Sequence, residues 1–347
     1  MQVRCESSVR GVRCASQGEK SEMTTRLIQC LCACFALCGP LAATAQNAAP
    51  YPAKPVRFVV VTAPGGGLDV VGRIIAERLS RNWGQHVIVE NRPGAGGNIA
   101  SETVARGSND GYTLLETTTN HNLNAFIYKK PGYEPRKDFV AVVQFTEAPS
   151  VIVVNAQSVH RSLRDVVAAA RAAPGKLVYA HGGNGQPTHV AMEAFKSAAK
   201  LDIAPVPYKG GGPATQDLLA NQVPLAMSAL PGMSQHLQSG ALRALAITSE
   251  KRWPTLPDVP SVAESGFAGY QHMTWIGLLA PAGTPRDIIE RVNKEVATVL
   301  AQPEVRQRIM TIGALPVGKS PADFEAMLKA DYESTQKLVV QIGLKVD

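Results

Sequence analysis

Four short glycine-rich segments interrupt the sequence, and all four offer the same chemistry. They cover residues 64–69, 93–98, 181–188 and 209–214. Each follows a strand-like stretch and precedes a helix-like pattern. A helix N-terminus leaves backbone N–H groups unpaired and carries the positive end of the helix dipole, and glycine lets a ligand approach the backbone. The segments therefore predict backbone sites for a small anion.

The first segment, "PGGGLD", lacks the spacing of a nucleotide-binding loop. No Gly-Lys-Ser/Thr follows its three glycines, and the dinucleotide pattern needs a glycine where Val70 stands. The seven histidines contain no close metal-ligand pair. A nucleotide-dependent enzyme would also need a ribose-binding acid and a catalytic pair, and we find neither. We expect a binding protein with no catalytic residue, no metal and no cofactor, and keep such an enzyme as the least favoured alternative.

The elements around these segments follow an α/β pattern. Strand-like residues 56–63 lead to a helical pattern at 69–84, and residues 86–98 lead to one at 99–107. The same order of strand, glycine turn and helix returns twice between residues 176 and 222. Such alternation predicts mostly parallel sheets flanked by helices, and ligands of these sheets gather at the carboxyl ends of the strands. The four loops should therefore converge on a cleft.

Helix starts are marked by capping patterns at three places. Ser162 and Asp165 have the spacing of a capping box. Thr284-Pro-Arg-Asp and Ser320-Pro-Ala-Asp each place a capping hydroxyl before a proline and an acid. The last two predict long amphipathic helices that close the chain.

The first 45 residues have the character of a leader. All six cysteines lie among the first 38 residues, and an apolar stretch after Arg26 ends before Ala43-Thr44-Ala45. We predict a secretory signal peptide cleaved after Ala45 and a periplasmic location, and keep Met23 as an alternative translation start. A membrane anchor that stays on the chain and a lipoprotein modified at Cys34 are the alternatives.

The mature chain would be cysteine-free and mildly basic. The leader holds five of the 35 basic and three of the 28 acidic residues, which leaves a net charge of about +5. Without disulfides, stability must come from the hydrophobic core. Basic residues are scattered and aromatic residues are scarce, so we expect no nucleic-acid partner.

Several segments together resemble one family of transport proteins. "PGGGLD", "VENRPGAGGNIA", "PGKLVYAHGGNGQPTHV", "VPYKGGGPA", "LRALAITSEKRWPTLPDVPSVAESG" and "WIGLLAPAGTP" occur in this order. They resemble the Bug proteins, the periplasmic receptors of tripartite tricarboxylate transporters, over essentially all of residues 50–347.

The resemblance implies a two-domain Venus-flytrap fold, a periplasmic-binding-protein fold in which two α/β domains are joined by two crossing strands. Residues 50–153 and 274–347 would form the first domain and residues 154–273 the second. It also implies a monomeric receptor that captures a small organic carboxylate and delivers it to a permease with a small and a large membrane subunit. A carboxylate sensor that presents its ligand to a two-component kinase is the alternative.

The resemblance also implies a set of ligand-binding residues. They are Gly65, Gly66, Gly67, Leu68, Asp69, Thr118, Thr119, His181, Gly185, Gln186, Tyr208, Gly210, Gly211 and Ser228. Four of them depart from the family pattern: His181 and Gln186 replace serines, Leu68 replaces a hydroxyl residue, and Ser228 replaces an acid. Because no arginine cluster appears among the loops, we favour an aromatic or aliphatic mono- or dicarboxylate over a tricarboxylate.

Some of these residues also have an ordinary structural interpretation. Asp69 either binds the ligand or caps its helix. Thr118 and Thr119 face the cleft or simply end a strand. His181 contacts the ligand, as a neutral donor or as a cation beside a second carboxylate, or it bonds to the glycine turn and points away. Trp275 fits hinge packing better than ligand stacking.

Overall fold

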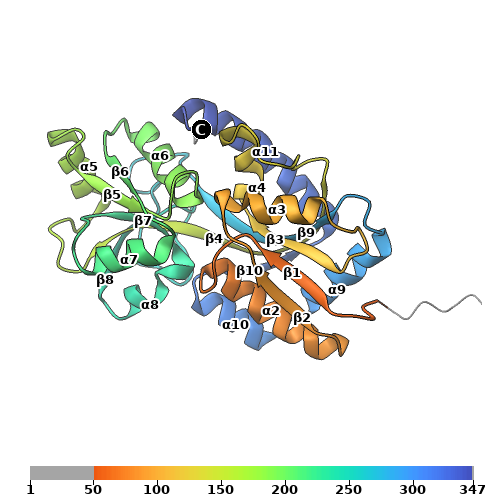
Figure 1. The fold of residues 1–347 in the computed structure, drawn as a ribbon. Helices are drawn as coiled ribbons and strands as arrows, with labels where there is room; N and C mark the ends of the chain where they lie inside the picture. Colours follow the sequence, from red (N-terminus) through yellow and green to blue (C-terminus); the bar gives the residue numbers. More distant parts are fainter. Residues whose placement is uncertain (1–50, 346–347) are drawn as a thin grey trace, which may run out of the picture. The chain divides into compact units, whose positions relative to one another are not determined.

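Strands and helices alternate along residues 51–345, the part of the chain that the computed structural model describes (Figure 1). The predicted leader and its cleavage site lie outside these residues. The strands are β1 (Val56–Val60), β2 (Val87–Asn91), β3 (Thr113–Thr118), β4 (Phe139–Asn155), β5 (Val178–His181), β6 (Ala204–Pro207), β7 (Ala226–Ala229), β8 (Leu242–Ile247), β9 (Met273–Pro281) and β10 (Leu315–Lys319).

The helices occupy the connections between these strands, except the last helix, which follows β10. They are α2 (Gly67–Trp83), η1 (Ala95–Gly97), α3 (Asn98–Ala105), α4 (Asn120–Ile127), α5 (Leu163–Ala172), α6 (Pro187–Ala199), α7 (Gly211–Leu219), η2 (Leu230–Gly232), α8 (Ser234–Gln238), α9 (Arg286–Ala301), α10 (Pro303–Thr311) and α11 (Pro321–Ile342). Among the described residues, no helix is long and apolar enough to cross a bilayer.

The strands pair in the order β2-β1-β3-β9-β4-β7-β5-β6, and β8 and β10 also pair with β4. In what we call the first sheet, β1 is parallel to β2 and β3, and β9 is antiparallel to β3 and to residues 139–149 of β4. In the second sheet, β5 is parallel to β6 and β7, whereas β7 and β8 run antiparallel to residues 150–155 of β4. The strand-helix alternation predicted the parallel pairs.

Separate groups of apolar side chains pack on the two sheets. Phe58, Leu115 and Phe145 are fully buried in the core of the first sheet. Tyr179 and Phe195 are fully buried in a core of the second. The helical pattern predicted at residues 69–84 places Val70, Val71, Ile74, Ile75 and Leu79 in one apolar stripe of α2. Four of these side chains are 4 % exposed or less, and Val70 is half-buried.

Two of the three predicted helix starts are confirmed in detail. Ser162 and Asp165 form the capping box of α5, and Ser320 accepts the Asp323 N–H at the start of α11. The cap predicted at Thr284 is wrong: α9 begins at Arg286, and the Thr284 hydroxyl donates to the Pro281 carbonyl at 2.7 Å instead. The short elements α10 and β10, which no capping pattern predicted, lie between the two closing helices.

Candidate functional site

The four glycine segments all lie between the carboxyl end of a strand and the start of a helix. They connect β1 to α2, β2 to α3, β5 to α6 and β6 to α7. These helices begin after Gly66, Gly97, Gln186 and Gly210, and in none of them does the residue before the helix cap the backbone with its side chain. The first-turn N–H groups are therefore left without the cap that serine gives α5 and α11, as an anion site requires.

Asp69 braces the first loop from inside α2. Its Oδ2 accepts the Gly65 N–H at 2.9 Å, its Oδ1 accepts the Asn91 amide at 2.9 Å, and the Arg73 Nε lies 3.0 Å from both oxygens. Although burial opposes ionisation, hydrogen bonds from Arg73, Gly65 and Asn91 hold the pKa of Asp69 below its ordinary value of 3.8. Asp69 stands three residues after Gly66. Its hydrogen bonds to the Gly65 N–H and to Asn91 fix the conformation of the first loop.

The end of β3 presents two buried hydroxyl groups. Thr118 and Thr119 are 7 % and 9 % exposed, and neither Oγ1 has a hydrogen-bond partner among the described residues. A buried hydroxyl without a hydrogen-bond partner lowers the stability of the fold, so each of these groups is available to bond to a ligand or to water.

Two asparagines of α4 hold the second glycine loop. The side chains of Asn120 and Asn124 donate to the Gly96 carbonyl at 3.2 and 3.1 Å and thereby tie this loop to α4.

The third and fourth loops are in direct contact. The Tyr208 N–H donates to the His181 carbonyl, and the Gly210 N–H donates to the Gly182 carbonyl, both at 3.0 Å. A Cβ on Gly182 would lie 3.5 Å from the Gly211 nitrogen, so the two backbones pass closely. The Tyr208 hydroxyl donates to Asp217 at 2.6 Å. The starts of α6 and α7 therefore form one unit.

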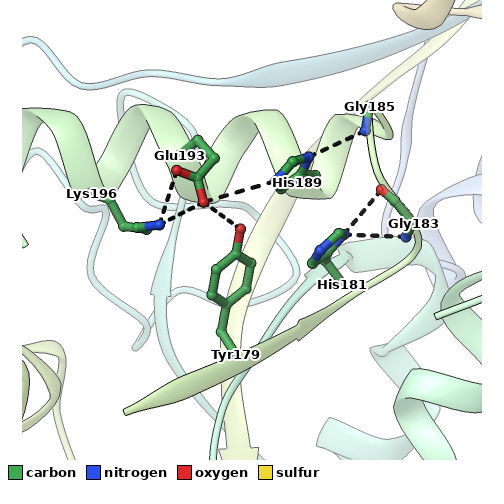
Figure 2. Close-up of polar contacts among 7 residues, drawn as sticks. All are labelled: Tyr179, His181, Gly183, Gly185, His189, Glu193 and Lys196. Atoms are coloured by element: carbon green, nitrogen blue, oxygen red, sulfur yellow. Dashed lines mark hydrogen bonds and ion pairs between the residues drawn. The ribbon is translucent and has the colours of Figure 1, made fainter. Parts of the chain in front are cut away.

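Two histidines stack inside this unit (Figure 2). The rings of His181 and His189 are 4.4 Å apart and nearly parallel, at 11°. Nδ1 of His181 lies 3.0 Å from the Gly183 carbonyl and 3.2 Å from the Gly183 N–H, and its Nε2 is buried without a partner. Burial, and next the neighbouring His189, lower the pKa of His181 to about 4, so the ring is neutral near pH 7.

The remaining predicted residues lie at different depths. Gly65, Gly66 and Gly211 are exposed, Gly185 is buried and Gln186 is half-buried. Leu68 is 7 % exposed and belongs to the core of the first sheet. Ser228, 6 % exposed, pairs with Val151 of β4. Trp275 packs edge to face on Phe324 of α11 at 5.4 Å, a packing role.

The predicted residues fall into two groups, one on each sheet. The two groups approach each other at the first loop, because a Cβ on Gly67 would lie 3.1 Å from the side chain of Pro231, which follows β7.

The structure also has two cavities, of about 430 and 470 Å³. One lies along α2 and α10 and the other beside α4 and α11, and none of the predicted ligand-binding residues lines either of them. Within residues 51–345, no three His, Cys, Asp or Glu side chains gather as metal ligands.

Sequence reasoning missed three polar residues that shape the site. Asn120 and Asn124 follow directly after the predicted threonines, in "TNHNLN", and this run of amides at the end of a strand was the available signal. His189 stands four residues after Gly185, the spacing of one helical turn.

Comparisons with known proteins agree on one family. The model of the tripartite tricarboxylate transporter family receptor, TctC, matches residues 71–344. The chain is 34 % identical to the protein BugT of Bordetella pertussis over 319 residues, which cover 90 % of this chain and 98 % of BugT.

Solved structures of similar sequence share the fold. The adipate-bound Rpa4515 of R. palustris is 35 % identical, with a TM-score of 0.81 over 85 % of this chain and 99 % of that one. MatC of Rhodopseudomonas palustris with bound malate is 31 % identical, with a TM-score of 0.77 over 83 % of this chain and 100 % of that one. The predicted α/β periplasmic-binding-protein fold is thus confirmed, and the chain belongs to the TctC family of receptors, the periplasmic solute-binding proteins that include the Bug proteins.

Proposed function

We propose that this receptor captures a small organic carboxylate between the glycine loops of its two sheets and delivers it to the membrane subunits of a tripartite tricarboxylate transporter. The observation that carries the proposal is the set of four helix N-termini, of α2, α3, α6 and α7, that no side chain of the preceding residue caps. A carboxylate accepts about four hydrogen bonds, and backbone N–H groups supply them without a cationic side chain.

The energetics suit a receptor that must also release its ligand. A hydrogen bond to a charged group contributes roughly 1.5 to 3 kcal/mol. Three or four such bonds, after the cost of association, support a dissociation constant near the micromolar range, about 8 kcal/mol.

For the ligand class, we propose a mono- or dicarboxylate with an aliphatic or aromatic body. Adipate and malate, the ligands named with the two solved relatives, are both dicarboxylates. Arg73, the arginine beside the first loop, is already bonded to Asp69 and Asn91, which disfavours a third carboxylate there. His181 would meet the ligand as a neutral group, or would take up a proton beside a second carboxylate.

A thermal-shift screen of the mature protein against a carboxylate library tests the function. A ligand at about 100 times its dissociation constant stabilises the folded state by about 2.7 kcal/mol. We expect stabilisation by at least one mono- or dicarboxylate and none by its methyl ester, which lacks the anionic oxygens. A screen in which esters and free acids act alike, or in which no acid acts, would contradict the proposal.

We also propose that residues 50–153 with 274–347 and residues 154–273 are the two domains. The support is the pairing: β4 changes partners from β9 to β7 and β8 between Pro149 and Val151, and β9 begins at Met273.

Finally, we propose export to the periplasm with cleavage after Ala45. The periplasmic family supports the location. Intact-mass analysis of protein recovered from the periplasm should give a chain that starts at Gln46 and does not react with thiol reagents. Mature protein that retains cysteine would show that the cleavage site is wrong.

A further inference from the structure

His189 is the third residue of α6 and lies next to Gly185 of the third glycine loop (Figure 2). It is 7 % exposed. Its Nδ1 accepts a hydrogen bond from the N–H of Gly185 at 3.2 Å. Gly185 is itself buried and has a φ of +71°, so its amide points inward where the imidazole supplies the partner.

This hydrogen bond also sets which nitrogen of His189 carries the proton. Because Nδ1 accepts, the proton of the neutral ring must be on Nε2. Nε2 faces Glu193, whose Oε1 is 3.9 Å away. Glu193 is held in turn by the Tyr179 hydroxyl at 2.7 Å and by Lys196 at 2.7 and 2.9 Å. The imidazole is therefore oriented from both ends.

The face of the same ring supports His181. The two rings stack at 4.4 Å, and His181 directs Nδ1 at Gly183. His189 thus contacts the loop at Gly185 through its edge and at His181 through its face. No other described side chain hydrogen-bonds to the Gly185 N–H.

We propose that His189 is a positioning residue of the ligand site, which holds the Gly185 amide in place before the ligand arrives. The proposal deepens the proposed function, since it assumes that the third loop takes part in binding. A loop that is already ordered loses less entropy when it binds, and this raises affinity without a new ligand contact.

The arrangement depends on a neutral imidazole. A protonated His189 would have no lone pair on Nδ1 and would repel the Gly185 N–H. Burial lowers the pKa of His189, and Lys196 acts in the same direction, while Glu193 opposes them. His181, stacked on the ring, is also neutral near pH 7. The loop is therefore held near neutral pH and released in acid.

Two variants separate the hydrogen-bond acceptor from the aromatic ring. In His189→Asn the amide oxygen reaches the position of Nδ1, so the acceptor stays and the ring is lost. In His189→Phe a ring stays and the acceptor is lost, which leaves the buried Gly185 N–H unpaired. For the best carboxylate of the screen, titration calorimetry should give an affinity within about threefold of the parent for Asn and roughly tenfold weaker for Phe.

NMR of the protein without ligand gives a second readout that a purely structural role would not move. In the parent, the nitrogen shifts of His189 should show a proton on Nε2, and the Gly185 amide proton should keep its shift in the Asn variant and move upfield in the Phe variant. A proton on Nδ1, parent-like affinity in the Phe variant, or equal losses in both variants would overturn the proposal. If the parent binds no carboxylate, the proposed function fails while the NMR test of His189 still stands.

Discussion

Glu116 is an acid that neither the loops nor the resemblance singled out, yet it lies against α2, the helix that follows the first loop. It is fully buried on β3, and neither carboxyl oxygen has a hydrogen-bond partner among the described residues. That helix carries Gly72 at the point of contact, where a Cβ would collide with Oε2 of Glu116. Burial, and next the negative charge of Asp69, raise the pKa of Glu116 well above its ordinary value of 4.5, against the opposing charge of Arg73.

We predict that Glu116 makes the protein less stable as the pH rises. The folded state keeps its proton at a pH where the unfolded chain has already lost it, so the free energy of unfolding falls with pH. The fall begins near the ordinary pKa of 4.5 and levels off above the raised pKa of the folded protein. Glu116→Gln, which imitates the protonated acid, should remove this slope. Urea unfolding at about pH 5, about pH 6.5 and about pH 8 measures it.

The matched control is Glu250→Gln, the same change at an exposed acid. It should unfold with the pH dependence of the parent. If Glu116→Gln also follows the parent, Glu116 is ionised in the folded protein and its charge is compensated.

For individual residues, the sequence predicts where the candidate site lies better than it predicts the role of each side chain. Glycine segments before helices mark where open N–H groups lie, because that chemistry belongs to the backbone and needs only local spacing. Side-chain roles depend on orientation. The spacing of Gly185 and His189 allows a contact, but only the fold shows that the imidazole accepts from the amide and that Asp69 is occupied by Arg73 and Asn91.

Helix α6 has a second contact face next to the one that holds the loop. Val190, 3 % exposed, forms an apolar cluster with Leu123 and Ile127 of α4 and Val339 of α11. The Gln341 amide of α11 also donates to the Ser197 hydroxyl at 3.4 Å. Helix α6 of the second sheet thereby packs on two helices of the first sheet. Figure 1 shows α6 near α11 at the top of the view.

We predict that Val190→Ala weakens ligand binding as well as stability. Removing two buried methyl groups costs about 1 to 3 kcal/mol of unfolding free energy. Because this cluster joins the helices of both sheets, its loss should also disfavour the arrangement in which both sets of loops reach one ligand. Val166→Ala, in the core of the second sheet, is the control: it should lower stability and leave the calorimetric affinity unchanged. Equal affinities in the two variants would show that the cluster does not contribute to binding.

Element prediction succeeded where a local signal was strong. The apolar stripe of α2 and the serine caps of α5 and α11 are read from neighbouring residues. Thr284 failed as a cap because its hydroxyl found the Pro281 carbonyl one turn earlier. The pairing of β4 with β9 joins residues more than 120 positions apart, and periodicity carries no information about such partners; here only the resemblance predicted crossing strands.

For the whole molecule, the α/β class follows from alternation alone, whereas the periplasmic-binding-protein fold came from the resemblance. The order of the strands depends on β4 and β9, whose antiparallel pairing interrupts the parallel pattern. The hydrophobic cores show the same division of the chain. The core of the first sheet contains residues from both ends of the described chain, from Val56 to Leu328, whereas this core of the second sheet contains only residues between Ile152 and Tyr270.

Strand β4 is a single 17-residue segment that belongs to both sheets. Its first part is bonded to β9 and β10, and its last part to β7 and β8. Fraying of either sheet therefore removes pairing partners from the strand on which the other is built. The amide protons in the middle of β4 should consequently be among the slowest to exchange with deuterium. A gene cut between the two parts of β4 would place β1, β2 and β3 on one fragment and β9 and β10 on the other, so neither fragment could complete the first sheet.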